Sequence, residues 1–345
     1  MYYSYCVQGV LASSESHIAP VVFLEPFVRS KKMDHSHKTG AHLHPKTFDE
    51  VIALGFPLDK LELLKDIHKK LVKPLLGGAA AFAPKPPGAP VTRQNQADLS
   101  PEKREAFRNA VVRLVEEGKY LELVQFHRDM SHDMHGMMGE TGLYRFLGWH
   151  RRYLVEFERE LQRVDAVLRP GATEKLAVPY WRWEDPFPAW LNGFLPANDP
   201  DTGTPPPSRK NASPPQKANA TDVDIIVNQF SIQNTGLNNE NDYTKFTYGL
   251  EGWGRRPDGT SLPGHNHGHA WVGGIMNNTM SSPTDPVFWL HHAEVDRLWH
   301  IWQQANSSAE PNLSGSDRIM DPWGESYDDL VDTEDLGYVY DSTSL

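Results

Sequence analysis

Cysteine is nearly absent from this chain: Cys6 is the only one among 345 residues. A single cysteine excludes an intrachain disulfide and a cysteine-based metal cluster, so any redox chemistry must use other ligands. Long apolar runs are also lacking. No stretch approaches the roughly 20 apolar residues that a membrane helix needs. The N-terminal MYYSYCVQGVLASS has neither a basic start nor a long apolar core, which predicts a soluble chain.

The chain also lacks an excess of positive charge. Its 34 lysines and arginines are outnumbered by 45 aspartates and glutamates, which gives a net charge of −11. This balance opposes non-specific binding to nucleic acid or to an anionic membrane. We therefore expect a small-molecule substrate and neither nucleic acid nor a membrane as partner. The sequence does not indicate how many chains assemble.

Histidine, in contrast, is abundant. Sixteen histidines are present, and most fall in three groups within residues 35–44, 127–150 and 265–300. Imidazole binds zinc, copper, iron and nickel, so clustered histidines without cysteine indicate a nitrogen-rich metal site. The first group, HSHKTGAHLH, has polar flanks and no periodicity, and we interpret it as surface histidines or a tag.

The hydrophobic pattern predicts a mainly helical chain. Residues 1–100 read as an irregular N-terminal extension with one helix over 58–76, and residues 101–345 as the core of a single domain that spans 1–345. Ser100 and Pro101 suit the start of a helix that ends near Gly118, and another begins near Tyr120. Runs in which apolar and polar residues alternate, as they do in strands, are scarce, and we expect one short strand near 177–181. Residues 195–216 and 228–241 are rich in proline and asparagine and predict surface loops.

The second histidine group contains two imidazoles that should point inward. In LELVQFHRDMSHDMH, His127 shares a helical face with Leu123 and Met130, and in GWHRRYLVEFERELQRV, His150 shares one with Leu154. A single inward histidine is more often a hydrogen-bonded core residue than a ligand. Their interpretation as ligands therefore depends on the third group.

The third group has the spacing of a metal site. HNHGHAWVGGIM places His265 and His269 at i and i+4, so both imidazoles can reach one ion. His267 lies about 160° away on the helix and should face elsewhere. In DPVFWLHHAEVDRLWHIW, His292 continues an apolar face and could complete a three-histidine site. His291 is turned about 100° from it, which favours a packing role or a place behind the ligands.

These residues resemble a known family. FLGWHRRYLVEFERE and DPVFWLHHAEVDRLW resemble the two copper signatures of tyrosinases, catechol oxidases and molluscan-type haemocyanins. The likeness extends over roughly 110–345: AVPYWRW resembles the PYWDW segment of the family, with Arg182 in place of aspartate, and LGYVYD resembles its tyrosine motif, at Tyr338 and Tyr340. The resemblance implies an antiparallel helical bundle that holds a dicopper centre, with long irregular loops and few short strands.

Five copper ligands carry over from the resemblance. His127 and His150 resemble the first and third ligands of copper A, and His265, His269 and His292 resemble the three ligands of copper B. The cofactors implied are two copper ions, with dioxygen as co-substrate.

The second copper A ligand departs from the family pattern. The usual slot, eight or nine residues before His150, holds Gly142 or Thr141 in this chain. The nearest candidates are His132 and His135. On a continuing helix His135 lies about 80° from His127, against about 140° for His132, so we favour His135, with Gly136 letting the chain turn. The alternatives are a copper A site with two histidines and a single-copper protein.

The resemblance also implies the reaction, which is oxidation of phenols and o-diphenols, and of o-aminophenols as a further substrate class, to o-quinones. Glu251, in LEGW, and Asn266 resemble the glutamate and asparagine of the family that hold a water beside the substrate. Their presence favours tyrosinase-like hydroxylation of monophenols, because a phenol must lose a proton whose pKa is near 10. The alternatives are a catechol oxidase only, or an oxygen-binding or copper-depleted relative.

Further features set expectations about the surroundings of the site. Gly268 and Ala270, which flank the second copper B histidine, are small and imply an open entrance. Cys6 is too far away in sequence to form the thioether that many relatives have. About fifty residues follow His292, too few for the C-terminal lid domain of larger relatives, so we expect no proteolytic activation. Glycosylation sequons, which weakly favour an extracellular protein, begin at Asn211, Asn219, Asn277, Asn306 and Asn312.

Overall fold

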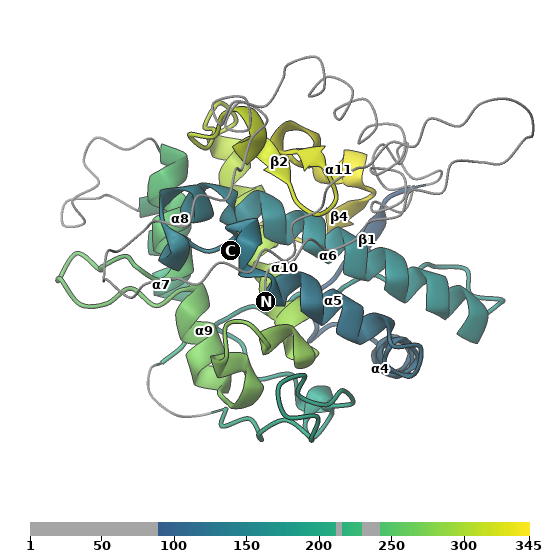
Figure 1. Cartoon of the computed structure of the whole chain (residues 1–345). Coiled ribbons are helices and arrows are strands. Elements are labelled where there is room, and N and C mark those ends of the chain that lie inside the picture. Colours follow the sequence, from purple (N-terminus) through teal and green to yellow (C-terminus); the bar gives the residue numbers. More distant parts are fainter. Residues whose placement is uncertain (1–88, 212–215, 230–241) are drawn as a thin grey trace, which may run out of the picture. The chain divides into compact units, whose positions relative to one another are not determined.

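The computed structural model describes residues 89–211, 216–229 and 242–345, and helices form most of this part of the chain (Figure 1). The α-helices are α4 (Pro101–Glu116), α5 (Lys119–Arg128), α6 (Glu140–Leu168), α7 (Ala220–Asp224), α8 (Asp242–Glu251), α9 (His265–Val272), α10 (Val287–Ala305) and α11 (Thr333–Leu336), and short 3₁₀ and π segments make up the rest of the helical residues. The mainly helical class expected from the sequence is confirmed.

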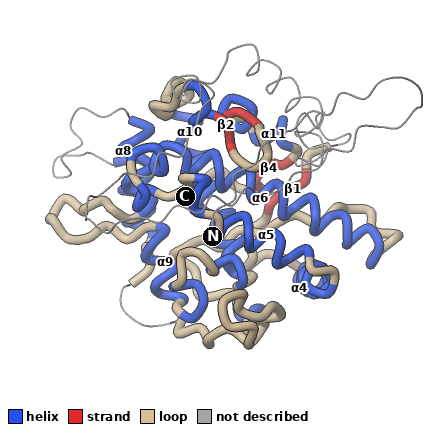
Figure 2. The backbone as a smooth tube through the Cα atoms, in the orientation of Figure 1, coloured by secondary structure: helices blue, strands red, loops and turns tan. Residues whose placement is uncertain are grey.

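Strands are few and short (Figure 2). β1 (Val91–Arg93) pairs in parallel with β4 (Tyr338–Tyr340), and β2 (Ile319–Met320) pairs antiparallel with β3 (Glu325–Ser326). The strand expected near 177–181 is wrong in extent, because the only pairing there is a single bridge between Tyr180 and Asn95. Proline at position 179, which lacks a backbone donor, is unfavourable to a longer ladder.

The expected starts of the first two described helices are confirmed. Ser100 adopts an extended conformation, and its hydroxyl accepts a hydrogen bond from the backbone nitrogen of Lys103 at 3.3 Å, which caps α4. Gly118 takes a positive φ of 76° between α4 and α5. This left-handed conformation costs glycine little and allows the chain to start a new helix at once.

The expectation of a helix continuing from His127 to His135 is wrong. α5 ends at Arg128, and the side chain of Asp129 then accepts a hydrogen bond from the backbone nitrogen of Ser131 at 3.1 Å. Asp133 follows with a φ of 47°. Short polar side chains offer the backbone such local partners and thereby end helices. The segment between α5 and α6 holds two short 3₁₀ turns, Met130–His132 and Gly136–Met138, joined by loops, so the angles of one continuous α-helix do not apply to it.

α6 lies at the centre of the described core, where it contacts α4, α8 and α10 (Figure 1). Its contact with α10 is aromatic: the rings of Phe157 and Trp289 stack with centroids 3.8 Å apart, and Tyr153 lies 4.7 Å from the same indole. All three side chains are fully buried. Burial of each large apolar side chain contributes about 1.5–3 kcal/mol, so this contact is a main source of the stability that holds α6 to α10.

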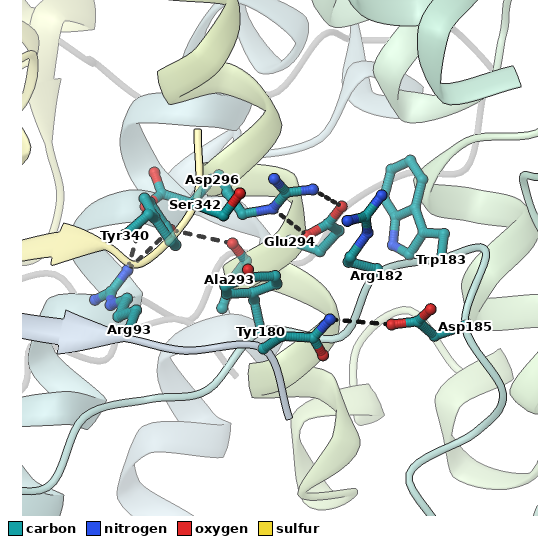
Figure 3. A network of polar contacts seen from close by, with 12 residues as sticks. Arg93, Tyr180, Arg182, Trp183, Asp185, Ala293, Glu294, Asp296, Tyr340 and Ser342 are labelled. Carbon is teal, nitrogen blue, oxygen red and sulfur yellow. Dashed lines mark hydrogen bonds and ion pairs between the residues drawn. The ribbon is translucent and has the colours of Figure 1, made fainter. Parts of the chain in front are cut away.

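A buried carboxylate also joins these two helices. Asp296 of α10 accepts hydrogen bonds from Arg151 of α6 at 2.5 Å and from the hydroxyls of Tyr338 and Tyr340 at 2.6 and 2.5 Å. Arg93 of β1 contacts it at 3.2 Å (Figure 3). Burial acts to raise the pKa of Asp296, but the two guanidinium charges and the hydroxyls outweigh it, and the pKa is lowered. The tyrosine motif thus serves to bind this carboxylate.

Arg182, which stands where the resemblance expects aspartate, has a partner close by. Its Nε donates to Glu184 at 2.6 Å, and it lies beside the buried Glu294 of α10 (Figure 3). Glu294 in turn accepts two hydrogen bonds of 2.8 Å from Arg297. The arginine is therefore part of a cluster of alternating charges on one side of α10.

Several expectations concern parts of the chain that the structure does not describe. The helix over 58–76, the histidines within 35–44, Cys6 and most of the loop 228–241 lie outside the described residues, and the single-domain expectation stays a prediction. The proline-rich stretch is irregular as far as Asn211, as expected. No helix in the described part of the chain has the length and apolar character to span a bilayer.

We expect Asp296→Asn to lower the free energy of unfolding by about 3–5 kcal/mol, because the guanidinium of Arg151 stays buried after its carboxylate partner is removed. Chemical denaturation followed by circular dichroism measures this change. Glu122→Gln, which removes the largely exposed pair with Lys119, is the control and should cost less than about 1 kcal/mol. Equal losses in both variants would show that the Asp296 network does not hold the core.

Candidate metal centre

Three buried histidines from separate segments meet at one point. His127 lies at the end of α5, His135 in the irregular segment before α6, and His150 within α6. The Nε2 atom of His127 lies 3.2 Å from Nε2 of His135 and 3.4 Å from Nε2 of His150. We name these residues the A group. It is the set that the sequence favoured for copper A.

A second set meets in the same way. His265 and His269 lie one turn apart in α9, and His292 comes from α10. The Nε2 atom of His265 is 3.0 Å from that of His269 and 3.1 Å from that of His292, and the remaining pair is 3.4 Å apart. We name these residues the B group. The spacing i, i+4 brought the first two together, and the packing of α9 on α10 added the third.

Four of the six rings have an oxygen at their other nitrogen, Nδ1. These contacts join His150 to Phe146 O at 2.8 Å, His269 to Met276 O at 2.8 Å, His265 to Asn266 Oδ1 at 3.0 Å and His127 to Met280 O at 3.4 Å. An N–H on Nδ1 that donates to such an oxygen leaves the lone pair of Nε2 free. In these rings the lone pairs therefore face the centre of their group.

This arrangement fits metal ions. Nitrogen lone pairs that face one another at 3.0–3.4 Å repel unless a cation lies between them. Nitrogens bound at about 2.0 Å in tetrahedral directions lie about 3.3 Å apart, which matches both groups. A set made only of imidazoles suits copper, zinc, iron or nickel, so geometry alone does not select the metal.

Aromatic side chains pack against both groups. Phe288 lies 4.1 Å from the ring of His292, and Phe146 lies 4.7 Å from that of His150. Burial lowers the pKa of His135 to about 3 and that of His269 to about 4. Uncharged rings are the form that binds a metal, so the site is prepared for metal without first losing protons at neutral pH.

The two groups are adjacent. The rings of His150 and His292 stack with centroids 4.4 Å apart and planes 16° from parallel, and those of His135 and His265 lie 6.3 Å apart. Each of these pairs joins one ring of the A group to one ring of the B group. Two ions held by these groups would therefore be close neighbours.

Gly142 explains how His135 reaches the A group. A Cβ atom at position 142 would lie 2.1 Å from the backbone oxygen of His135, so only glycine permits this approach of the segment to α6. Position 142 is one of the two slots where the family pattern places the second copper A histidine. In this chain the glycine at that position has no side chain, which leaves room for the backbone of His135.

The other candidate, His132, lies apart from the A group. Its ring stacks on Trp149 with centroids 5.8 Å apart, and its Nε2 lies 3.8 Å from Asp129. His132 is buried but is not among the three nitrogens that meet. The structure thus brings His135, and not His132, to His127 and His150.

His291 lies beside the B group. Its Nδ1 accepts a hydrogen bond from the indole nitrogen of Trp183 at 2.9 Å, and its ring stacks on His265 at 5.1 Å. Burial and the charge of His269 lower the pKa of His291, against a smaller opposite effect of the His265 carbonyl. The sequence suggested this packing role for His291. One of its ring nitrogens nevertheless lies within 4.8 Å of the B-group nitrogens.

A cavity of about 300 Å³ opens onto both groups. Its lining includes His127 and His135 from the A group and His265 and His269 from the B group. The volume is at the lower end of the range for small-molecule sites, which suits a single aromatic ring.

Glu251 lies in the wall of this cavity. Its carboxylate accepts hydrogen bonds from the backbone nitrogen of Gly136 at 3.1 Å and from the indole nitrogen of Trp253 at 3.2 Å. Burial raises the pKa of Glu251 to about 8, although both hydrogen bonds oppose the shift. The carboxyl group is therefore beside the segment of His135 and closer in pKa to a phenol than an exposed glutamate is.

The neighbours of the B group differ in part from expectation. Asn266 lines the cavity, and its side-chain oxygen contacts the ring of His265. His267 also lines the cavity, although the helical angle predicted that it faces elsewhere. Gly268 packs on His291, and neither Gly268 nor Ala270 is in the lining, so the open entrance expected from their small size stays a prediction.

Several residues of the cavity lining were missed from the sequence, among them Trp253 and Met137. Trp253 is 43% exposed and Met137 is 62% exposed, and both belong to the lining. Trp253 is joined to the site through its indole nitrogen, which donates a hydrogen bond to Glu251. An exposed aromatic residue two positions after Glu251 was the available signal, but a single exposed tryptophan carries little information by itself.

Comparison with known proteins identifies the family. The family model described as the common central domain of tyrosinase matches residues 117–204 and 190–305. The tyrosinase of Streptomyces glaucescens is 32% identical over 276 residues, which cover 70% of this chain and 95% of that protein. The tyrosinase of Streptomyces antibioticus is 30% identical over 277 residues, covering 68% and 93%.

The fold is also similar to a solved structure. A functional unit of octopus hemocyanin superposes with a TM-score of 0.51 and 19% sequence identity, covering 74% of this chain and 69% of that one. Both histidine groups lie within the residues that the family model matches. The chain belongs to the tyrosinase family, and its two histidine groups fit the copper A and copper B sites of that family.

Proposed function

We propose that this chain oxidises phenols and o-diphenols to o-quinones with dioxygen at a pair of copper ions. The proposed ligands are His127, His135 and His150 for copper A, and His265, His269 and His292 for copper B. The observation that carries the proposal is the meeting of two three-nitrogen groups that share one cavity of about 300 Å³. The identity to Streptomyces proteins named tyrosinase supports the same activity.

The copper ions, when bound, supply the redox chemistry with dioxygen as oxidant. The residues of this chain supply the rest. Phe146 and Phe288 pack against the imidazoles, and the contacts at Nδ1 fix the direction of four of the six ligand rings. The cavity admits a ring beside His265 and His269, where an o-diphenol or an o-aminophenol presents two adjacent donor atoms.

We further propose that monophenols are substrates, with Glu251 and Asn266 assisting the loss of the phenolic proton. Both residues line the cavity, and Glu251 is buried with its carboxylate held by Gly136 and Trp253. A base whose pKa is raised towards that of the phenol transfers the proton at lower cost. An o-diphenol binds through two oxygens and depends less on such a base.

We expect Glu251→Gln to reduce monophenol hydroxylation by about 10²–10⁴-fold, the usual contribution of a general base, and diphenol oxidation by less than about tenfold. Initial rates with a monophenol and with the matching catechol measure the split, and copper per chain must stay unchanged. Parallel losses on both substrates would remove the role of Glu251 as a base.

We expect His135→Ala to lower bound copper from about two ions to about one per chain, because the A group loses one of three nitrogens. Elemental analysis after reconstitution measures this. His132→Ala is the matched control and should retain about two ions, since His132 lies apart from the A group. The opposite pattern would assign the ligand to His132.

Gly142→Ala should reduce copper A occupancy without removing any imidazole, because the new Cβ would lie 2.1 Å from the His135 oxygen. Gly148→Ala in the same helix is the control: its Cβ would meet side-chain atoms of Met320 and Tyr327 at 3.2 Å, which can move. Copper analysis and circular dichroism compare the two variants. Full copper content in Gly142→Ala would refute the space-making role of this glycine.

A further inference from the structure

A fourth imidazole, that of His291, lies close to the three that form the B group. One nitrogen from each of His265, His269, His291 and His292 lies within 4.8 Å of the others. A catalytic metal site keeps a position open for substrate, commonly with three protein ligands, whereas a fourth imidazole would close it. A three-histidine site therefore requires a structural feature that prevents His291 from binding the metal.

Trp183 contacts one of the two ring nitrogens of His291. Its indole nitrogen lies 2.9 Å from Nδ1 of His291, and both residues are buried. An indole N–H can only donate, so Nδ1 must accept with its lone pair. In an uncharged imidazole the ring hydrogen is then on Nε2. Nδ1 has no free lone pair and Nε2 has none at all, so neither nitrogen can bind a metal.

Packing fixes this ring in place. A Cβ at Gly268 would lie 2.4 Å from Cε1 of His291, so the ring is pressed against the backbone of α9. It also stacks on His265 with planes 17° from parallel. The Nε2 atom is buried and makes no regular hydrogen bond among the described residues. The backbone carbonyl of His265 contributes a smaller interaction with this ring, so the bond from Trp183 is the main contact that sets the position of the ring hydrogen.

We propose that Trp183 is a positioning residue that keeps His291 out of the copper B ligand set, which leaves copper B with three imidazoles and an open position. This inference rests on the proposed copper B site. When the indole N–H is removed, the ring hydrogen can move to Nδ1, and the lone pair of Nε2 becomes available to the metal. His291 then acts as a fourth ligand, and the open position is lost.

The test compares Trp183→Phe with Trp181→Phe. Trp181 is equally buried, but its indole nitrogen donates to the backbone oxygens of Pro186 and Asp185 at 3.0 and 3.3 Å and not to His291. The readouts are copper per chain, the affinity for azide as a small copper ligand, and the number of imidazole ligands from X-ray absorption. We expect Trp183→Phe to keep its copper, gain an imidazole ligand and bind azide about tenfold more weakly or worse. Trp181→Phe should bind azide as the unaltered chain does.

A double variant separates ligand exclusion from packing. Gln at position 291 cannot act as an imidazole ligand, so Trp183→Phe combined with His291→Gln should bind azide like His291→Gln alone. If Trp183 acts by packing, the double variant stays as weak as Trp183→Phe, and the proposal is overturned. The proposal is also overturned if Trp183→Phe and Trp181→Phe bind azide with the same affinity.

A second replacement covers the case in which Trp183→Phe does not fold. Benzothienylalanine at position 183 keeps the two fused rings and replaces only the N–H by sulfur, and the same loss of azide affinity is expected. These readouts do not use phenol turnover. A chain that shows the azide pattern but oxidises no phenol would refute the proposed function alone, and an oxidase without the azide pattern would refute this inference alone.

Discussion

The contact between α6 and α10 is the constraint on which the rest of the structure depends, and the buried carboxylate of Asp296 secures it. Asp296 lies one turn after His292, and its partner Arg151 follows His150 directly. The same bond therefore fixes the register in which the rings of His150 and His292 stack at 4.4 Å. The strands β1 and β4 contribute Arg93 and two tyrosine hydroxyls to this carboxylate, which is why short strands far from the histidines matter to the site.

The histidine groups are arranged at a cost that a metal ion offsets. Six imidazoles meet in the two groups, five of them are buried, and four direct a lone pair at the centre of their group. Burial lowers the pKa of the rings and keeps them uncharged. Backbone oxygens of Phe146 and Met276 hold two of the rings in the required tautomer. A cation between the nitrogens turns this repulsion into binding, so the same geometry that is unfavourable without metal favours its uptake.

Glycine and tryptophan determine which histidines can act as ligands. Gly142 removes a side chain from the slot where relatives place a histidine and thereby admits the backbone of His135. Gly268 lets His291 lie against α9, and Trp183 occupies the lone pair of that ring. None of these three residues has a side chain that binds metal. The ligand set depends as much on backbone approach and on hydrogen position as on the number of histidines nearby.

The sequence by itself determined which helical faces are buried, because the period of apolar residues is a local property. His127, His150, His265, His269 and His292 could be placed inward in this way, and the ends of α4 and the start of α5 followed from capping residues. It could not determine the path to His135, since α5 ends at Arg128 through local bonds of Asp129 that periodicity does not record. Only the tertiary structure brought Glu251 to Gly136 and Trp183 to His291, because each contact joins residues more than a hundred positions apart whose meeting depends on how the helices pack.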